Sequence, residues 1–213
     1  MTKLRHLIAG LIISLLLVLF CWSATTASAD ILDDLKAKQG RIKTVSASFT
    51  QEKKTKLLTK PIKTEGRFLY KQPDRIRWEY RGSVNLQVIF NGKDIWLYYP
   101  ELKEADKLSG LSQYGSLMQF DVLTMSRDYT ITARKEKTII YLKFSPKVKG
   151  PISQIDMEIP EESSFPHKVK LFDQNNEPTT ITFKDIKLNP EIQDSSFTFV
   201  PEKGVVVRER SLR

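Results

Sequence analysis

The chain has 213 residues, of which 40% are hydrophobic and 28% charged, and this composition is typical of a folded domain with a sizeable core. Its 34 basic and 25 acidic side chains give a formal net charge of +9, but no basic run with interleaved aromatic residues indicates a nucleic-acid-binding surface. The single cysteine, Cys21, lies in a segment that we expect to be removed, which excludes disulfides, thiolate metal sites and a cysteine nucleophile from the mature protein.

Residues 1–29 have the pattern of a cleavable signal peptide. Lys3 and Arg5 precede an apolar run, Leu7–Phe20, and the small residues Ala27-Ser28-Ala29 follow it. A transmembrane anchor needs about 20 apolar residues, and this run is shorter. We therefore expect the chain to be exported and this segment to be removed.

A lipoprotein signal acylated at Cys21 is the alternative interpretation of the leader. Such signals have a small residue before the cysteine, and here that residue is Phe20. We expect cleavage before Asp30 instead. Two of the 34 basic residues and none of the acids are then lost, which leaves a single domain of 184 residues, 30–213, with a net charge of +7.

An amphipathic helix is predicted at the start of this domain. Ile31, Leu35 and Ile42 recur near helical spacing, and aspartates in the first turn suit the positive end of the helix dipole. From Thr44 onward the apolar period changes to two, which predicts a first strand.

Alternation of apolar and polar residues predicts a long series of strands after this point. Ile76, Trp78 and Tyr80 face one way, while the charged residues between them face the other. The pattern recurs up to residue 200 and gives roughly eleven strands, separated by turn signals such as Asn91-Gly92. Consecutive hairpins form an antiparallel sheet. Because few helices are predicted to cover it, the sheet must curl and bury its own concave side.

The alternation breaks between Leu108 and Ser126, where large apolar residues crowd together and predict short helices or a folded loop. Leu117, Met118 and Phe120 belong to this insertion. Two interpretations stay open. The insertion is either a plug that completes the core or a movable lid over the concave face, with methionines that can repack around variable acyl chains.

The sequence contains none of the common catalytic motifs, whether of hydrolases, nucleotide-binding proteins or zinc peptidases. After export one histidine remains, His167, and without a second histidine or a cysteine we interpret it as a surface residue. We therefore expect no enzyme activity, no metal site and no cofactor.

Several segments, taken in their order along the chain, resemble the outer-membrane lipoprotein carrier family of the LolA type. An opening helix is followed by a strand, then by a segment that begins with glycine and ends with proline, and then by two further strand segments. A closing F-x-F and P-x-x-G-V pattern ends the domain. The segments are residues 46–51 (SASFTQ), 66–73 (GRFLYKQP), 77–80 (RWEY), 91–98 (NGKDIWLY) and 197–205 (FTFVPEKGV).

The resemblance implies an incomplete or open antiparallel β-barrel with an N-terminal helix and short lid helices. It implies a periplasmic monomer that takes acylated lipoproteins from an inner-membrane lipoprotein-releasing transporter to an outer-membrane lipoprotein receptor. An apolar cavity would hold the acyl chains, and each residue assigned to it has plain core packing as its alternative. The expected lining is Phe49, Phe68, Tyr70, Ile76, Trp78, Tyr80, Leu86, Val88 and Phe90, with Leu117, Met118 and Phe120 from the lid.

One position departs from the family pattern. In well-known members an arginine stands directly before the proline equivalent to Pro73 and is thought to latch the lid to the barrel, and here that residue is Gln72. Glutamine can form hydrogen bonds but carries no charge. We expect a latch at Gln72 to be weaker, or to use Lys71 instead.

Two other classes of function are alternatives to the carrier. A sensor module of the same fold would bind a lipid or a lipoprotein and report it to a membrane partner, but such sensors usually carry an additional domain, and few residues remain after Val207. A hydrolase on a β-barrel is disfavoured because the sequence indicates no nucleophile and base pair.

Overall fold

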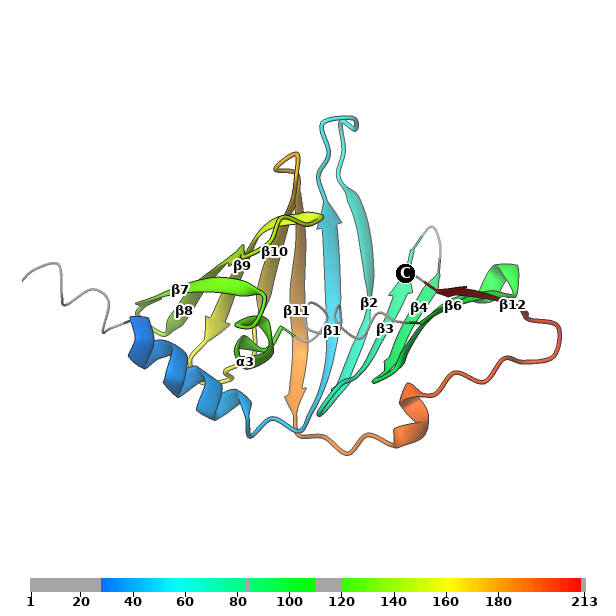
Figure 1. Ribbon diagram of the computed structural model, residues 1–213, viewed down its shortest axis with the longest axis horizontal. Coiled ribbons are helices and arrows are strands. Elements are labelled where there is room, and N and C mark those ends of the chain that lie inside the picture. Colours follow the sequence, from blue (N-terminus) through cyan, green and yellow to red (C-terminus); the bar gives the residue numbers. More distant parts are fainter. Residues whose placement is uncertain (1–27, 83–84, 110–119, 212–213) are drawn as a thin grey trace, which may run out of the picture.

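The computed structural model describes residues 28–82, 85–109 and 120–211 of the chain (Figure 1). Twelve strands form one sheet in these residues. The strands are β1 (Thr44–Lys53), β2 (Ile62–Lys71), β3 (Arg75–Arg81), β4 (Leu86–Asn91), β5 (Asp94–Tyr99), β6 (Glu104–Ser109), β7 (Tyr129–Glu136), β8 (Ile139–Pro146), β9 (Ile152–Pro160), β10 (Lys168–Asp173), β11 (Pro178–Leu188) and β12 (Val206–Ser211). Short helices are η1 (Pro100–Leu102), α3 (Val122–Met125) and η3 (Asp194–Phe197).

The strand order is β12-β6-β5-β4-β3-β2-β1-β11-β10-β9-β8-β7. Strand β1 therefore lies between two ribbons of hairpins, one formed by β2 to β6 with β12 and the other by β7 to β11. The pairs are antiparallel except for the last strand, which runs parallel to β6 from the pair Val206 and Glu104 onward. The predicted open antiparallel sheet is therefore confirmed. In the described residues it has twelve strands rather than roughly eleven, and the parallel pairing of β12 with β6 at its edge was not predicted.

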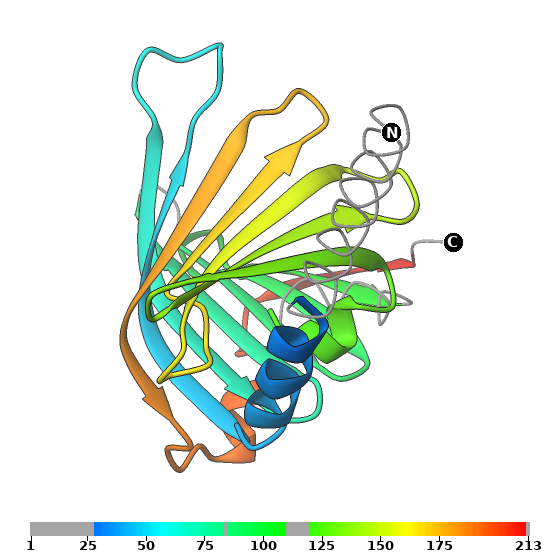
Figure 2. The same cartoon turned by 90° about the vertical axis from the view of Figure 1, so that its left-hand side faces the viewer.

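The sheet is strongly curved, and Figure 2 shows its two ribbons enclosing a concave side. In the described part of the chain the sheet begins at β12 and ends at β7, so the barrel is open rather than closed. The main core lies on this concave side, where apolar residues of both ribbons form one cluster. The predicted curling is confirmed, and its cause is the single apolar face that each strand offers.

Residues 28–39 form the N-terminal helix, slightly earlier than the predicted stretch from Ile31 to Ile42. Gly40 continues the hydrogen bonding with one bond to Lys36, and the chain then turns into β1. Leu35 is completely buried, and Ile31 and Leu32 pack against the core. The helix therefore lies at the open side of the curved sheet, next to α3 (Figure 2).

The C-terminal segment covers part of the outer face before it forms β12. Its η3 contacts β3 and β4, and Phe197 is buried there. Further on, the Phe199 ring lies 5.0 Å from Trp96 and 4.9 Å from Tyr98. In the same described residues, none of the helices is both long and apolar enough to span a bilayer.

Candidate functional site

The nine residues predicted to line an acyl cavity all lie on the concave face, in three rows that cross the strands. Directly paired residues of an antiparallel sheet point to the same side, so the registers of β1 to β4 define these rows. They are Val45–Tyr70–Ile76–Phe90, Ala47–Phe68–Trp78–Val88 and Phe49–Gly66–Tyr80–Leu86. The structure therefore places these nine residues together on one face, and their role in lining an acyl cavity stays a prediction.

Aromatic rings dominate the centre of these rows. The Trp78 ring lies 4.6 Å from Phe68 and 4.8 Å from Phe49, nearly perpendicular to the latter, and it stacks on Tyr80 at 5.9 Å. Gly66 makes this packing feasible, because a Cβ at that position would lie 2.8 Å from the Phe49 ring. The missing side chain thus provides the space into which Phe49 folds.

The cluster is dry. Six of the predicted lining residues are at most 7% exposed, and Tyr80, Leu86 and Val88 are half-buried. Burial raises the pKa of the Tyr80 hydroxyl to about 12 and also raises the pKa of Tyr70, for which Asp121 and Asp74 are smaller causes. Both hydroxyls therefore stay neutral at ordinary pH.

The opposite ribbon and a neighbouring loop complete the cluster with two phenylalanines that were not assigned to the site from the sequence. Phe183 of β11 lies 5.4 Å from Phe68 and 5.8 Å from Trp78. Phe165, from the loop before β10, lies 5.4 Å from Phe183. The period of two assigns Ile181 and Phe183 to one face of a strand, but it does not indicate that this face meets Trp78.

Phe120 closes the cluster from the side of the insertion. Its ring stands perpendicular to Trp78 at a centroid distance of 6.0 Å and lies 5.9 Å from Phe183. The residue is 3% exposed and has a φ of 57°, an unfavourable conformation for a phenylalanine. Leu117 and Met118, the other two predicted lid residues, lie outside the described residues.

The helix α3 follows Phe120 directly. Asp121 caps it by accepting hydrogen bonds from the backbone N–H groups of Leu123 and Thr124, both at 3.0 Å. Val122 and Met125 are fully buried, so the helix is held by its apolar side.

Gln39 ties α3 to the rest of the molecule and was missed by the sequence analysis. Its side-chain oxygen accepts a hydrogen bond from the backbone N–H of Val122 at 2.9 Å, and its side-chain nitrogen donates to the carbonyl of Ser164 at 3.1 Å. The residue is 7% exposed. A glutamine in an amphipathic helix carries no signal of its own, because its partners are distant in sequence.

The two residues predicted as a latch bind elsewhere. The Gln72 oxygen accepts a hydrogen bond from the Lys43 ammonium group at 3.1 Å. Lys71 lies on the outer face, where it donates to the carbonyl of Ile192 at 3.0 Å and pairs with Asp194 at 2.6 Å. Within the described residues, neither of these two side chains forms a hydrogen bond to α3, whereas the side chain of Gln39 does.

A pocket of about 280 Å³ lies between the N-terminal helix, the β2–β3 turn and α3. Tyr70, Phe120 and Phe165 line its apolar side, and Gln72 and Asp121 line its polar side. It adjoins the aromatic cluster, whose described rings pack against one another. Acyl binding by this face therefore stays a prediction, and it requires the cluster to open.

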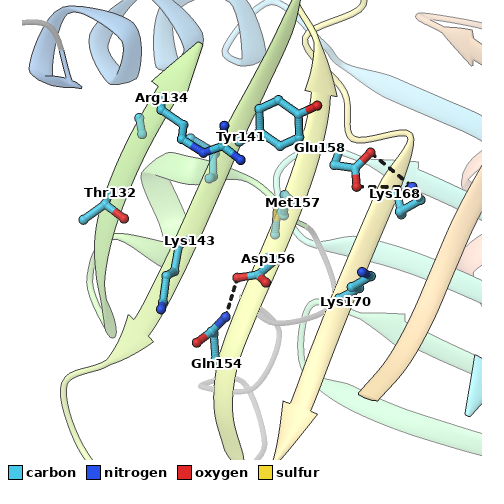
Figure 3. A pocket seen from close by; sticks show the side chains of 12 residues that line it. Thr132, Arg134, Tyr141, Lys143, Gln154, Asp156, Met157, Glu158, Lys168 and Lys170 are labelled. Carbon is cyan, nitrogen blue, oxygen red and sulfur yellow. Dashed lines mark hydrogen bonds and ion pairs between the residues drawn. The ribbon is translucent and has the colours of Figure 1, made fainter. Parts of the chain in front are cut away.

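A second, larger hollow of about 630 Å³ lies on the outer face of β7 to β10, where Figure 3 shows its polar side chains side by side. Lys168 bonds to both oxygens of Glu158 at 3.2 Å, and Gln154 donates to Asp156 at 2.7 Å, while Arg134, Lys143 and Lys170 make the lining positive on balance. These pairs are typical of a solvated sheet face. His167 is half-buried beside this face, with its Nε2 atom 3.3 Å from Glu158.

Comparison with protein families shows to which family the chain belongs. Residues 40–200 match the model of the family described as "Outer membrane lipoprotein carrier protein LolA". The chain belongs to this family. The match covers every strand from β1 to β11 as well as η3 and α3, which is the part that builds the concave aromatic face.

Relatives of the LolA family agree with this assignment over most of the chain. The outer-membrane lipoprotein carrier protein of Pseudomonas aeruginosa (strain UCBPP-PA14) is 26% identical over 204 residues, which cover 92% of this chain and 98% of the relative. That of Legionella pneumophila (strain Corby) is 24% identical over 198 residues, 90% of this chain and 96% of the relative.

Solved structures share the LolA fold. An uncharacterized conserved protein from Thermus thermophilus superposes with a TM-score of 0.55 at 12% identity, covering 85% of this chain and 98% of that one. At such identity the likeness concerns the fold alone.

Within the described ranges of this LolA-family chain, no three His, Cys, Asp or Glu side chains gather in a metal-binding arrangement.

Proposed function

We propose that this LolA-family chain is a periplasmic, non-enzymatic carrier that binds the acyl chains of lipoproteins on its concave aromatic face. It would receive them from an inner-membrane lipoprotein-releasing transporter and pass them to an outer-membrane lipoprotein receptor. The observation that carries the proposal is the continuous face of three rows from β1 to β4, closed by one ring, Phe120, from a separate short segment. The family and the names of its relatives support the carrier role.

The physical need for such a carrier is large. Each methylene group exposed to water costs about 0.8 kcal/mol. A lipoprotein with several long acyl chains therefore stays in its membrane unless an apolar surface replaces the bilayer. The concave rows offer such a surface, because their side chains are apolar or aromatic and the two tyrosine hydroxyls on them remain uncharged.

Binding requires the closed cluster to open. The pocket beside Phe120 measures about 280 Å³, and ligand pockets usually span about 300–1,000 Å³ even for drug-sized molecules. The natural space for an acyl chain is the volume that Phe120 occupies between Trp78 and Phe183. The four-residue helix α3 would move with Phe120, and this movement breaks the hydrogen bond from Val122 to Gln39. A carrier must release its cargo, and a ring that returns to the cluster assists release.

Acyl binding is testable on protein recovered from exporting cells without detergent. Native mass spectrometry should detect a retained lipid or lipopeptide, and titration with a fluorescent triacylated lipopeptide should give saturable binding. Trp78→Asp should abolish this binding, because the charge would lie between Phe49 and Phe68.

The matched control is Trp96→Asp, at a tryptophan on the outer face against Phe199. Circular dichroism would verify that both variants are folded. If a folded Trp78→Asp protein binds the lipopeptide as the wild type does, the concave face is not the acyl site.

A further inference from the structure

The hairpin that joins β1 and β2 extends beyond the neighbouring strand ends, on the side of the sheet opposite the N-terminal helix (Figures 1 and 2). We call residues 53–63 the β1–β2 tip. It carries three exposed apolar side chains: Leu57 is 91% exposed, Leu58 50% and Ile62 48%. Exposed apolar side chains gathered at one protruding point mark an interaction site more often than scattered ones do.

The tip is held in place by hydrogen bonds to the β10–β11 turn. A side-chain oxygen of Glu177 accepts hydrogen bonds from the Thr55 hydroxyl at 3.1 Å and from the Lys56 backbone N–H at 2.9 Å. The Leu58 backbone N–H donates to the Thr55 carbonyl at 3.2 Å and closes the turn. The two leucines are therefore presented to solvent by an anchored turn.

Five lysines surround these apolar residues, and all five side chains are exposed: Lys53, Lys54, Lys56, Lys60 and Lys63. Glu52 lies 3.7 Å from Lys54 and 3.8 Å from Lys63, which are loose ion pairs. For the other three lysines, the described residues contain no carboxylate within ion-pair distance. The tip is therefore strongly positive as well as apolar.

We propose that the β1–β2 tip docks on the surface of an anionic lipid bilayer, with Leu57 and Leu58 inserted between the lipids and the lysines at the phosphate groups. Apolar side chains framed by lysines are the combination that binds at the boundary of head groups and acyl chains. Each lysine near an anionic membrane surface adds attraction, which decays within a Debye length.

Charge complementarity favours a bilayer over a protein groove as the partner. A groove would have to supply an acidic rim around an apolar slot of matching shape, whereas a membrane supplies both features over its whole surface. This inference goes beyond acyl binding on the concave face, because the tip projects beyond the strand ends at the top of Figure 1, whereas α3 lies well below it.

The test is flotation of the exported protein, with its N-terminus determined by mass spectrometry, together with vesicles. Vesicles containing phosphatidylglycerol should bind the protein, and pure phosphatidylcholine vesicles should bind it much more weakly. The double substitution Leu57→Ser and Leu58→Ser should lower the partition coefficient by about tenfold or more. Lys56→Gln with Lys60→Gln should lower binding to the anionic vesicles only, and added salt should do the same.

Leu102→Ser is the matched control, because Leu102 is 64% exposed at another site, in η1. A fluorophore sensitive to polarity, attached to Leu57→Cys in a Cys21→Ser background, should shift to the blue on anionic vesicles, and the same label at Leu102→Cys should not.

The proposal is overturned if the wild-type protein does not float with anionic vesicles, or if Leu102→Ser reduces binding as much as the tip variant. It is also overturned if the label at residue 57 responds only when a membrane protein is present in the vesicles. Lipopeptide binding by the tip variant should equal that of the wild type. Failure of the wild type to bind lipopeptide would refute the carrier function and leave the vesicle result standing.

Discussion

The side-chain oxygen of Gln39 and the backbone N–H of Val122 are joined by a buried hydrogen bond of 2.9 Å. Through it, the end of the N-terminal helix holds the first residue of α3 beside Phe120. The same amide group donates to Ser164 in the loop that carries Phe165. One side chain thus connects three segments that meet at the open side of the sheet.

Replacement of Gln39 should loosen this side of the molecule. Gln39→Ala leaves the Val122 N–H and the Ser164 carbonyl without their partner, and an unsatisfied buried group costs about 1–3 kcal/mol. Urea unfolding should show the loss of stability, and hydrogen exchange should show faster exchange in α3. Gln72→Ala removes an exposed bond to Lys43 and should change both measurements little. Equal effects of the two substitutions would contradict the role of Gln39.

Gly66→Ala should destabilise the protein through a steric clash. The added methyl group would meet the backbone oxygen of Glu79 and lie 2.8 Å from the Phe49 ring. Overpacking of this kind costs about 1–3 kcal/mol. Gly150→Ala is the control, because nothing lies within 4 Å of its added methyl group. Thermal unfolding of the two variants measures the difference, and an unchanged midpoint for Gly66→Ala would show that both the Phe49 ring and the β3 backbone at Glu79 can shift without loss of stability.

Removal of the Phe120 ring should lower the stability of the protein and raise its affinity for lipopeptide. Phe120→Ala should lower the free energy of unfolding by about 3–5 kcal/mol, as is usual for a buried phenylalanine. It should also raise the affinity for lipopeptide, because no ring has to leave the space between Trp78 and Phe183. Phe199→Ala, on the outer face, should leave that affinity unchanged. A weaker affinity of Phe120→Ala would mean that the ring contacts the acyl chain directly.

Asp194 should contribute to the loss of stability at acid pH. Hydrogen bonds from Lys71 and Arg75 lower the pKa of its carboxyl group to about 2, from the ordinary 3.8. A depressed pKa in the folded state stabilises the protein above about pH 4, and this contribution is lost as the pH falls toward 2. Asp194→Asn should therefore flatten the decrease of the urea midpoint between pH 4 and 2. Lys71→Gln should reproduce part of this effect. An unchanged pH dependence of the urea midpoint in both variants would show that the Lys71–Asp194 ion pair does not contribute to stability.

The sequence predicted the concave face well, because the period of two assigns each residue of a strand to one side. Once Trp78 was placed inside, its neighbours in the alternation were determined, and the registers of β2 to β4 then aligned them in rows. The same pattern does not say which strand is a neighbour. The contact of Phe183 with Trp78 depends on the pairing of β1 with β11, which are far apart in sequence.

The parts that could not be predicted depend on contacts between distant segments. The polar partners of Gln39 belong to two different loops, and no local pattern in the helix indicates them. The parallel pairing of β12 follows a passage over the outer face, which the alternation of Val206 and Arg208 cannot reveal. Whether the insertion is a plug or a lid is a matter of energy differences, and a sequence pattern does not contain them.

The central position of β1 has a mechanical consequence. It is hydrogen-bonded to β2 along its whole length and to β11 with one shift between Ser46 and Ser48. The two ribbons meet at this seam, and an irregular register there allows extra twist. A change of coiling at the seam would alter the angle between the ribbons and leave the regular β1–β2 ladder intact. If the concave face binds acyl chains as proposed, a wider angle would add room for a bulkier cargo to the space that Phe120 vacates.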